Sequence, residues 1–354
     1  MTSPAPEPNP EVLLQEQGAL GRITLNRPKA LNSLTLGMIR AITQQLQQWR
    51  DDERIRAVLI EGAGERGLCA GGDIRAIYDA VKAGDESLPT AFWAEEYRLN
   101  AMLPHYPKPI VGLMDGICMG GGVGVSAHGS HRVVTERSKV GMPETGIGFA
   151  PDVGGTYLLS RAPGHTGTYM ALTGTPVGAA DAIHCGLADH YVPSDRLAAL
   201  ADELAGGEVD AVLREFAEPG ERAPATFAPS ELEWIDEAFA AEDVEGILQR
   251  LRARPEQGAH QAADVLETKS PTSLKVTLRG VRSGAETLEQ ALDREFRVSL
   301  SCVEIGDFVE GVRATLVDKD RDPKWSPKHL SEVDEQRVAR FFEPLGRREL
   351  GLSG

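Results

Sequence analysis

The chain has 354 residues, of which 41% are hydrophobic and 25% are charged, a composition typical of a globular protein that can bury a sizeable core. Its formal net charge of −16 argues against nucleic acid or an anionic membrane as the main partner, because both bind clustered positive charge. No stretch approaches 18 continuous apolar residues, so no membrane span is expected.

The N-terminal segment, MTSPAPEPNP, is rich in proline and lacks both a basic segment and an apolar run. We therefore predict a disordered tail over residues 1–10 and no signal peptide. Two short runs of strand-forming residues then flank Gln17-Gly18, and this pattern predicts a hairpin.

Apolar residues next recur every three or four positions, which predicts one face of a helix that begins near Thr35. The residues of this face are Met38, Ile42, Leu46 and Trp49. Buried strands are predicted for the apolar runs at 58–60 and 110–113, and a helix for PTAFWAEEYRLNAML between them. Two further short strands are predicted within HRVVTERSKVGMPE.

This alternation of strands and helices predicts an α/β domain over residues 11–195, built with crossover connections. Either a doubly wound sheet or a spiral of repeated ββα turns would fit, and periodicity alone does not decide between them. Residues 196–354 are rich in alanine, glutamate and leucine and predict a helical region. Thr287 and Gln290 have capping-box spacing at the start of one of its helices.

The cysteines indicate a reducing compartment and no metal site. Cys69, Cys118, Cys185 and Cys302 lie far apart and form no CxxC pair. We therefore predict buried free thiols in a cytoplasmic protein. No two cysteine or histidine ligands have the spacing of a zinc finger, so no metal is expected.

Two glycine-rich segments could carry chemistry, LCAGGDI at 68–74 and GICMGGGVGVSAHG at 116–129. The second fits a dinucleotide-binding GxGxxG motif poorly, and no Gly-Lys-Ser/Thr follows to make a P-loop. Glycines at the start of a helix expose backbone N–H groups next to the positive end of the helix dipole. Such donors suit an oxyanion hole, although tight packing turns would explain the same glycines.

A third segment, GMPETGIGFAPDVGGT, holds two carboxylates, Glu144 and Asp152. Each alone could be structural, as a helix cap or a turn former. Beside two candidate N–H donors, they instead suggest a site for carbonyl chemistry with an acid, a base and an oxyanion hole. No serine or cysteine stands in a nucleophile-elbow motif to pair with the eight histidines, so a Ser/His or Cys/His hydrolase is disfavoured.

Four segments together resemble the crotonase (enoyl-CoA hydratase/isomerase) superfamily: LCAGGDI, GICMGGGVG, MPETGIGFAPDVGGTYLLSR and DFVEGVRATLVDKDRDPKW. The resemblance covers nearly the whole chain after the tail. It implies a ββα spiral core with a helical C-terminal region, an acyl-CoA substrate, and an oxyanion hole formed by the N–H groups of Gly72 and Gly121. It also implies CoA contacts from Lys29, Ala30, Leu31, Ala70, Gly71, Asp73 and Ile74.

The chain departs from the hydratase pattern at two positions. Hydratases carry a glutamate where this chain has Gly124, and usually a glycine where it has Asp152, while Glu144 is retained. This pattern, with ETKSPTSLKVTLR and Glu96, is similar to the 3-hydroxyisobutyryl-CoA hydrolase branch of the family. The resemblance implies hydrolysis of a short 3-hydroxyacyl-CoA in valine catabolism.

In this interpretation, Glu144 and Asp152 are catalytic, Glu96 and Gly121 contact the substrate with them, no cofactor or metal is needed, and homo-oligomers are possible. Two alternatives stay open. One is an enoyl-CoA hydratase or isomerase acting on a short acyl-CoA, and the other is a CoA-binding protein without catalytic activity.

Overall fold

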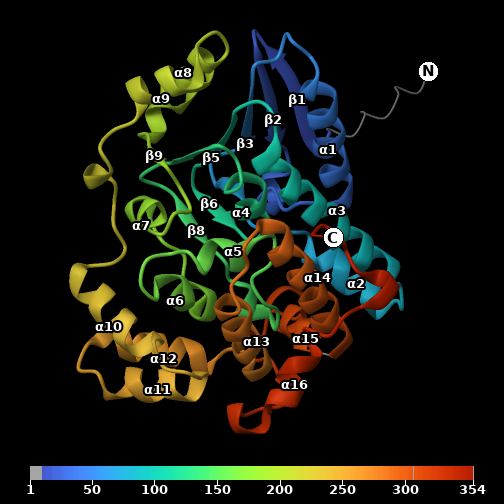
Figure 1. Cartoon of the computed structure of the whole chain (residues 1–354), viewed down its shortest axis with the longest axis vertical. Coiled ribbons are helices and arrows are strands. Elements are labelled where there is room, and N and C mark those ends of the chain that lie inside the picture. The colour runs from blue at the N-terminus through green and yellow to red at the C-terminus, as the bar shows by residue number, and fades with distance from the viewer. Residues whose placement is uncertain (1–9, 306, 354) are drawn as a thin grey trace.

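The computed structural model describes residues 10–305 and 307–353 (Figure 1). The predicted tail therefore lies outside the described residues, apart from Pro10. Nine strands form a six-stranded sheet in the order β1-β2-β3-β5-β7-β9 and a three-stranded sheet in the order β4-β6-β8. Their bounds are β1 Val12–Gln17, β2 Leu20–Leu25, β3 Ala57–Gly62, β4 Gly67–Cys69, β5 Ile110–Met114, β6 Ile117–Met119, β7 His131–Val134, β8 Lys139–Gly141 and β9 His190–Tyr191.

The connections between the two sheets make the fold a spiral. After β2, successive strands alternate between the sheets, so each turn of the chain adds one strand to each of them. All pairs are parallel except the β1–β2 hairpin. Helices complete each turn before the next pair of strands begins. The choice left open by the periodicity is thereby decided in favour of the ββα spiral, as the family resemblance implied.

The first predicted elements are confirmed. β1 and β2 form the hairpin, with Gln17 paired to Leu20 and Gly18 at a φ of +59° in the turn. Thr35 caps α1 (Leu36–Arg50) by accepting a hydrogen bond from Met38 N at 3.1 Å. The predicted apolar face of this helix is buried.

The two glycine-rich segments belong to the smaller sheet. LCAGGDI begins within β4 and GGGVG follows β6, so the glycines of both segments come directly after its short strands. Both β4 and β6 have only three residues, too few for a hydrophobic period to be recognised.

The first four residues of β3 and all of β5 are apolar or glycine and buried, because both faces of the larger sheet are covered. Val58 and Ile60 of β3 join the main core, while Leu59 between them packs into a second cluster against α8 and α9. The four cysteines are free and buried, as predicted.

Helices and connecting segments make up the chain beyond Ser194, as predicted from its composition. Thr287 Oγ1 accepts a hydrogen bond from Gln290 N, but Gln290 Oε1 reaches back to Glu286 N, so the predicted capping box is formed only on one side. The division into two domains near residue 195 remains a prediction.

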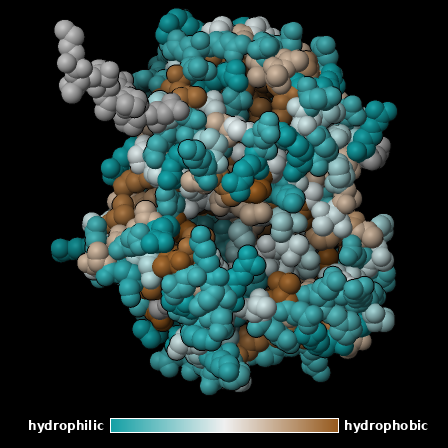
Figure 2. Space-filling model, turned by 180° about the vertical axis from the view of Figure 1, so that it is seen from behind, coloured by the Kyte–Doolittle hydropathy of each residue, from teal (hydrophilic) through white to brown (hydrophobic). Residues whose placement is uncertain are grey.

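The helices are α1, α2 Ile74–Lys82, α3 Ser87–Met102, α4 Gly121–Ser126, α5 Gly155–Leu159, α6 Thr166–Thr173, α7 Ala179–His184, α8 Leu197–Leu204, α9 Val209–Phe216, α10 Pro229–Phe239, α11 Val244–Ala253, α12 Gln257–Glu267, α13 Pro271–Arg282, α14 Leu288–Ile305, α15 Asp307–Val312 and α16 Glu335–Arg340. Within the described part of the chain, no helix has both the length and the apolar character needed to cross a membrane. Hydrophilic side chains dominate the face shown in Figure 2, with the hydrophobic ones in small separate groups.

Candidate active site

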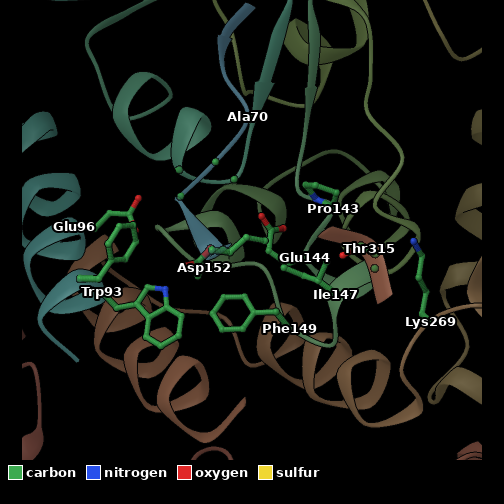
Figure 3. Close-up of a pocket in the computed structure, with 17 residues that line it drawn as sticks. Ala70, Trp93, Glu96, Pro143, Glu144, Ile147, Phe149, Asp152, Lys269 and Thr315 are labelled. Carbon is green, nitrogen blue, oxygen red and sulfur yellow. The ribbon is translucent and has the colours of Figure 1, made fainter. Parts of the chain in front are cut away.

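The strands of the smaller sheet direct three loops to one place. The loops after β4, β6 and β8 border a cavity of about 420 Å³ (Figure 3). This is the end of a parallel sheet at which ligands commonly bind in α/β proteins. The predicted site residues that line the cavity are Ala70, Gly71, Gly72, Ile74, Glu96, Gly121, Glu144 and Asp152.

The N–H groups of Gly72 and Gly121 lie close together. A Cβ atom built on Gly121 would stand 3.3 Å from Gly72 N. Leu34 N donates a hydrogen bond to Gly71 O, and Asp73 N donates one to Leu34 O. The N–H of Gly72, between Gly71 and Asp73, has no partner among the described residues. Gly121 is the first residue of α4, where a helix leaves its N–H groups without an internal acceptor. The two loops thus present a pair of free donors to the cavity.

Neither glycine could carry a side chain without displacing a neighbour. A Cβ on Gly72 would approach Phe92 to 2.9 Å, and one on Gly121 would approach Glu96 Oε1 to 2.7 Å. The preceding Gly120 has a φ of +51°, a left-handed conformation that favours glycine. Close packing and backbone conformation therefore both require glycine at this point.

Glu144 enters the cavity from the loop after β8. It begins a short 3₁₀ helix, Glu144–Ile147, and its side chain is buried. Its Oε1 lies 2.8 Å from the position of a Cβ on Gly120, so the carboxylate lies beside the two free N–H groups. The other oxygen, Oε2, is buried and has no hydrogen-bond partner among the described residues. A buried carboxylate oxygen without a partner is costly and suggests a ligand-binding role.

Asp152 is held by a chain of hydroxyl groups. Tyr97 donates a hydrogen bond to Asp152 Oδ2 at 2.7 Å, and Ser299 lies 2.6 Å from the same tyrosine oxygen. Since Tyr97 has one proton and gives it to the carboxylate, Ser299 must be the donor to Tyr97. All three residues are buried, so the carboxylate is fixed by groups from α3 and α14.

Glu96 approaches the cavity from α3. It is 2% exposed, and its Oε1 has no partner among the described residues. Glu96, Glu144 and Asp152 therefore bring three buried carboxyl groups to one cavity, together with the free N–H pair.

Burial governs the ionisation of this cluster. It raises the pKa of Glu96 and of Glu144 well above the usual range, and the negative charge of Asp152 raises both further. Burial also raises the pKa of Asp152, to about 7, against the opposing hydrogen bond from Tyr97. Three such carboxyls cannot all be ionised cheaply, so some of them share protons near neutral pH.

Gly124 leaves no room for the glutamate that hydratases carry there. A Cβ at this position would lie 2.7 Å from Val153 Cβ and 3.0 Å from Asn100 Nδ2. Val153 directly follows Asp152, so the turn that carries Asp152 occupies the space above Gly124. A side chain at position 124 therefore conflicts with Val153 in the turn that carries Asp152.

The two predicted CoA-binding segments lie next to each other. Ala70 N donates a hydrogen bond to Leu31 O at 3.0 Å. Lys29 and Ala30 are exposed, and neither they nor Leu31 line the cavity. Asp73 is also absent from the cavity wall, because its carboxylate pairs with Arg27 at 2.9 Å and caps α2. The CoA-binding role of all seven residues, including Ala70, Gly71 and Ile74 of the cavity wall, remains a prediction.

The rest of the cavity wall includes three aromatic residues, Phe92, Trp93 and Phe149, and one cation, Lys269. Trp93 and Phe149 stack with ring centroids 5.3 Å apart, and Phe308 packs against both. Figure 3 shows Lys269 at the far side of the cavity from Glu96. Burial lowers the pKa of Lys269, and Nζ has no hydrogen-bond partner among the described residues. None of these residues was predicted from the sequence to be a site residue.

The comparisons with known proteins agree with this geometry. The family model described as enoyl-CoA hydratase/isomerase matches residues 20–342. The chain belongs to this family. Among curated members, the mitochondrial 3-hydroxyisobutyryl-CoA hydrolase of Danio rerio is 45% identical over 351 residues, covering 97% of this chain and 92% of that protein. The Homo sapiens protein of the same name is 43% identical over 349 residues, covering 96% and 90%.

Two solved structures match nearly the whole chain. A carnitinyl-CoA dehydratase from Mycobacterium thermoresistibile has a TM-score of 0.92 and 50% identity, covering 98% of this chain and all of that one. An enoyl-CoA hydratase from Rhodobacter sphaeroides has a TM-score of 0.91 and 40% identity, covering 96% and 99%. The chain is thus a crotonase-family acyl-CoA enzyme, and the names of its relatives differ on the reaction.

Proposed function

We propose that the chain hydrolyses the thioester of a short 3-hydroxyacyl-CoA, namely 3-hydroxyisobutyryl-CoA, to the free acid and CoA. The observation that carries this proposal is the exchange at Gly124 and Asp152. The hydratase glutamate has no space, and a buried aspartate fixed by Tyr97 lies near Glu144 instead. The curated relatives named 3-hydroxyisobutyryl-CoA hydrolase support the same reaction. Its place in valine catabolism is what the family resemblance implies.

In this proposal, the thioester carbonyl accepts hydrogen bonds from Gly72 and Gly121. The carbonyl oxygen gains negative charge as the tetrahedral intermediate forms, and fixed N–H donors stabilise that charge. Loss of one such donor typically raises the barrier by about 2.7–4 kcal/mol. The first residues of α4 place the positive end of a helix at the same point.

Glu144 then drives formation of the new carbon–oxygen bond by one of two routes. It attacks the carbonyl carbon itself, the carbon–sulfur bond breaks, and water opens the resulting anhydride. Alternatively it takes a proton from a water molecule that attacks the same carbon. In both routes CoA leaves as a thiolate that takes up a proton. Mass spectrometry of acid-quenched enzyme would separate the routes, because only the first leaves the acyl group on Glu144.

Asp152 and Glu96 act on the water and on the acyl group. Asp152 positions water, hydrogen-bonds the substrate hydroxyl or shares a proton with Glu144. Glu96 has a buried oxygen without a partner, which is suited to a polar substituent of the acyl group. The aromatic residues around it provide the apolar surface that a short branched acyl chain requires.

A second candidate is hydration or dehydration of a short acyl-CoA, which the names of the two structural neighbours favour. Hydration in the usual manner needs two glutamates around one water, and the position of the second is Gly124. Both reactions can be measured on one enzyme preparation. Free thiol released from a panel of short acyl-CoAs reports hydrolysis, and loss of the enoyl absorbance reports hydration.

Thiol release from 3-hydroxyisobutyryl-CoA, without hydration of crotonyl-CoA, is the expected result. Hydration without thiol release would replace the first proposal by the second. Absence of both activities would favour the third interpretation, a non-catalytic CoA-binding protein. The curated relatives are named as mitochondrial, whereas a cytoplasmic location and a possible homo-oligomer remain our predictions for this chain.

A further inference from the structure

The turn that carries Asp152 has an unusual backbone. Val153 has a φ of +52°, and Gly154 follows with a φ of +80°. A β-branched residue in the left-handed region is strained by about 1–3 kcal/mol and persists only when its surroundings hold it there. The proposed reaction uses Asp152 but does not explain what holds the next residue in this conformation.

His128 holds the carbonyl of Val153. The imidazole Nε2 lies 2.7 Å from Val153 O, and the side chain is 7% exposed. A carbonyl oxygen only accepts hydrogen bonds, so Nε2 carries the proton and donates. Burial lowers the pKa of His128 to about 4, so the ring is neutral at physiological pH. His128 lies just beyond α4, the helix that begins with Gly121.

Glu295 holds the following residues of the same turn. Its carboxylate accepts hydrogen bonds from Gly154 N at 2.7 Å, from Thr156 N at 2.9 Å and from Thr156 Oγ1 at 2.5 Å. The side chain is 2% exposed and comes from α14, which also carries Ser299. The turn is therefore held on one side by His128, which follows the helix that begins with Gly121, and on the other side by Glu295 of α14.

We propose that His128 and Glu295 are positioning residues that keep the Asp152 turn in its strained, productive conformation. The inference rests on the proposed function, because it takes Asp152 to be part of the hydrolytic site. Neither side chain lines the cavity, so each acts through the backbone of the turn. His128 also connects this turn to the segment that begins with Gly121. This connection fixes the position of Asp152 relative to the oxyanion hole.

Two substitutions of similar size separate hydrogen bonding from packing. His128→Gln keeps an N–H donor near the position of Nε2, whereas His128→Leu fills the space without one. We expect His128→Leu to lower kcat about 100-fold with KM changed less than threefold, because misplacing a catalytic group by about 1 Å costs that much. His128→Gln should stay within about tenfold of wild type. His184→Leu, at an exposed histidine, is the matched control.

A crystal structure of His128→Leu supplies the readout that does not depend on activity. We expect Val153 to leave the left-handed region and Asp152 to shift, while CoA binding measured by calorimetry stays within threefold of wild type. The same turn should relax in Glu295→Gln, whose amide offers one acceptor oxygen in place of two.

Other outcomes would overturn the proposal. Equal loss of activity and of melting temperature in the Gln and Leu variants would show that His128 only packs. An unchanged φ at Val153 in both the Leu and the Glu295→Gln variants would show that the turn holds itself. If wild type hydrolyses no acyl-CoA, the proposed function fails, and the two variant structures still decide whether these residues hold the turn.

Discussion

The contact between Gly124 and Val153 makes a quantitative prediction about Gly124→Ala. The new Cβ would lie 2.7 Å from Val153 Cβ, whereas carbon atoms in contact stay about 3.5–4.0 Å apart. The turn must therefore retreat by about 1 Å, and a displacement of this size costs about 100-fold in rate. Overpacking should also lower the free energy of unfolding by about 1–3 kcal/mol.

The assay is thiol release from 3-hydroxyisobutyryl-CoA together with thermal unfolding of each variant. Val153→Gly removes the obstructing side chain and suits a φ of +52°, so it should restore most of the activity lost in Gly124→Ala. Gly280→Ala is the control for adding a methyl group to a helical glycine, because its nearest new contact, at 3.6 Å, is ordinary. Full activity in Gly124→Ala would refute the steric conflict between positions 124 and 153. The same conclusion would follow if Gly124→Ala combined with Val153→Gly were no more active than Gly124→Ala alone.

Three further predictions concern the acids and their supports. Glu144→Gln should lower turnover at least about 100-fold without lowering the melting temperature, since it removes the attacking or proton-accepting group; residual activity above a tenth would exclude that role. The raised pKa of Asp152, about 7 against 3.8, contributes stability that is complete below pH 4 and lost as pH rises through 7. Asp152→Asn should therefore raise the free energy of unfolding by about 1–4 kcal/mol at pH 8 but little at pH 4, as measured by urea denaturation; an equal gain at both pH values would contradict this. The same substitution should lower turnover at least about 100-fold, because it removes a catalytic carboxylate. Tyr97→Phe removes the hydrogen bond that lowers the pKa of Asp152, so the pH dependence of kcat/KM should move to higher pH. An unshifted pH dependence would show that ionisation of Asp152 does not control kcat/KM.

Much of this arrangement could be predicted from residue patterns because it depends on local chemistry. Glycines with exposed N–H groups, and acids flanked by glycine and proline, are visible in the sequence, and both sets line the cavity. The hairpin and α1 were predictable from turn residues, a capping threonine and helical periodicity. The spiral needed the family resemblance, since strands of three residues carry no usable period.

The supports of the acids could not be predicted in the same way. Tyr97 follows Glu96 directly and could have been suspected, but Ser299 meets it from a helix about two hundred residues further along the chain. The hydrogen bonds of His128 and Glu295 depend on how a strained turn packs between two helices. No spacing in the sequence shows that the Asp152 turn fills the space over Gly124.

The three loops at the ends of β4, β6 and β8 give the enzyme a modular design. Each turn of the spiral brings at least one site residue to the same place: Gly72 from the first, Gly121 from the second, and Glu144 with Asp152 from the third. A substitution in one loop leaves the strands that anchor the other two unchanged. Substitutions in the loop after β8 can therefore change the catalytic acids while the N–H donors of the other two loops stay in place. Where two of these segments touch, at Gly124 and Val153, a side chain added at position 124 requires a compensating change in the turn that carries Asp152.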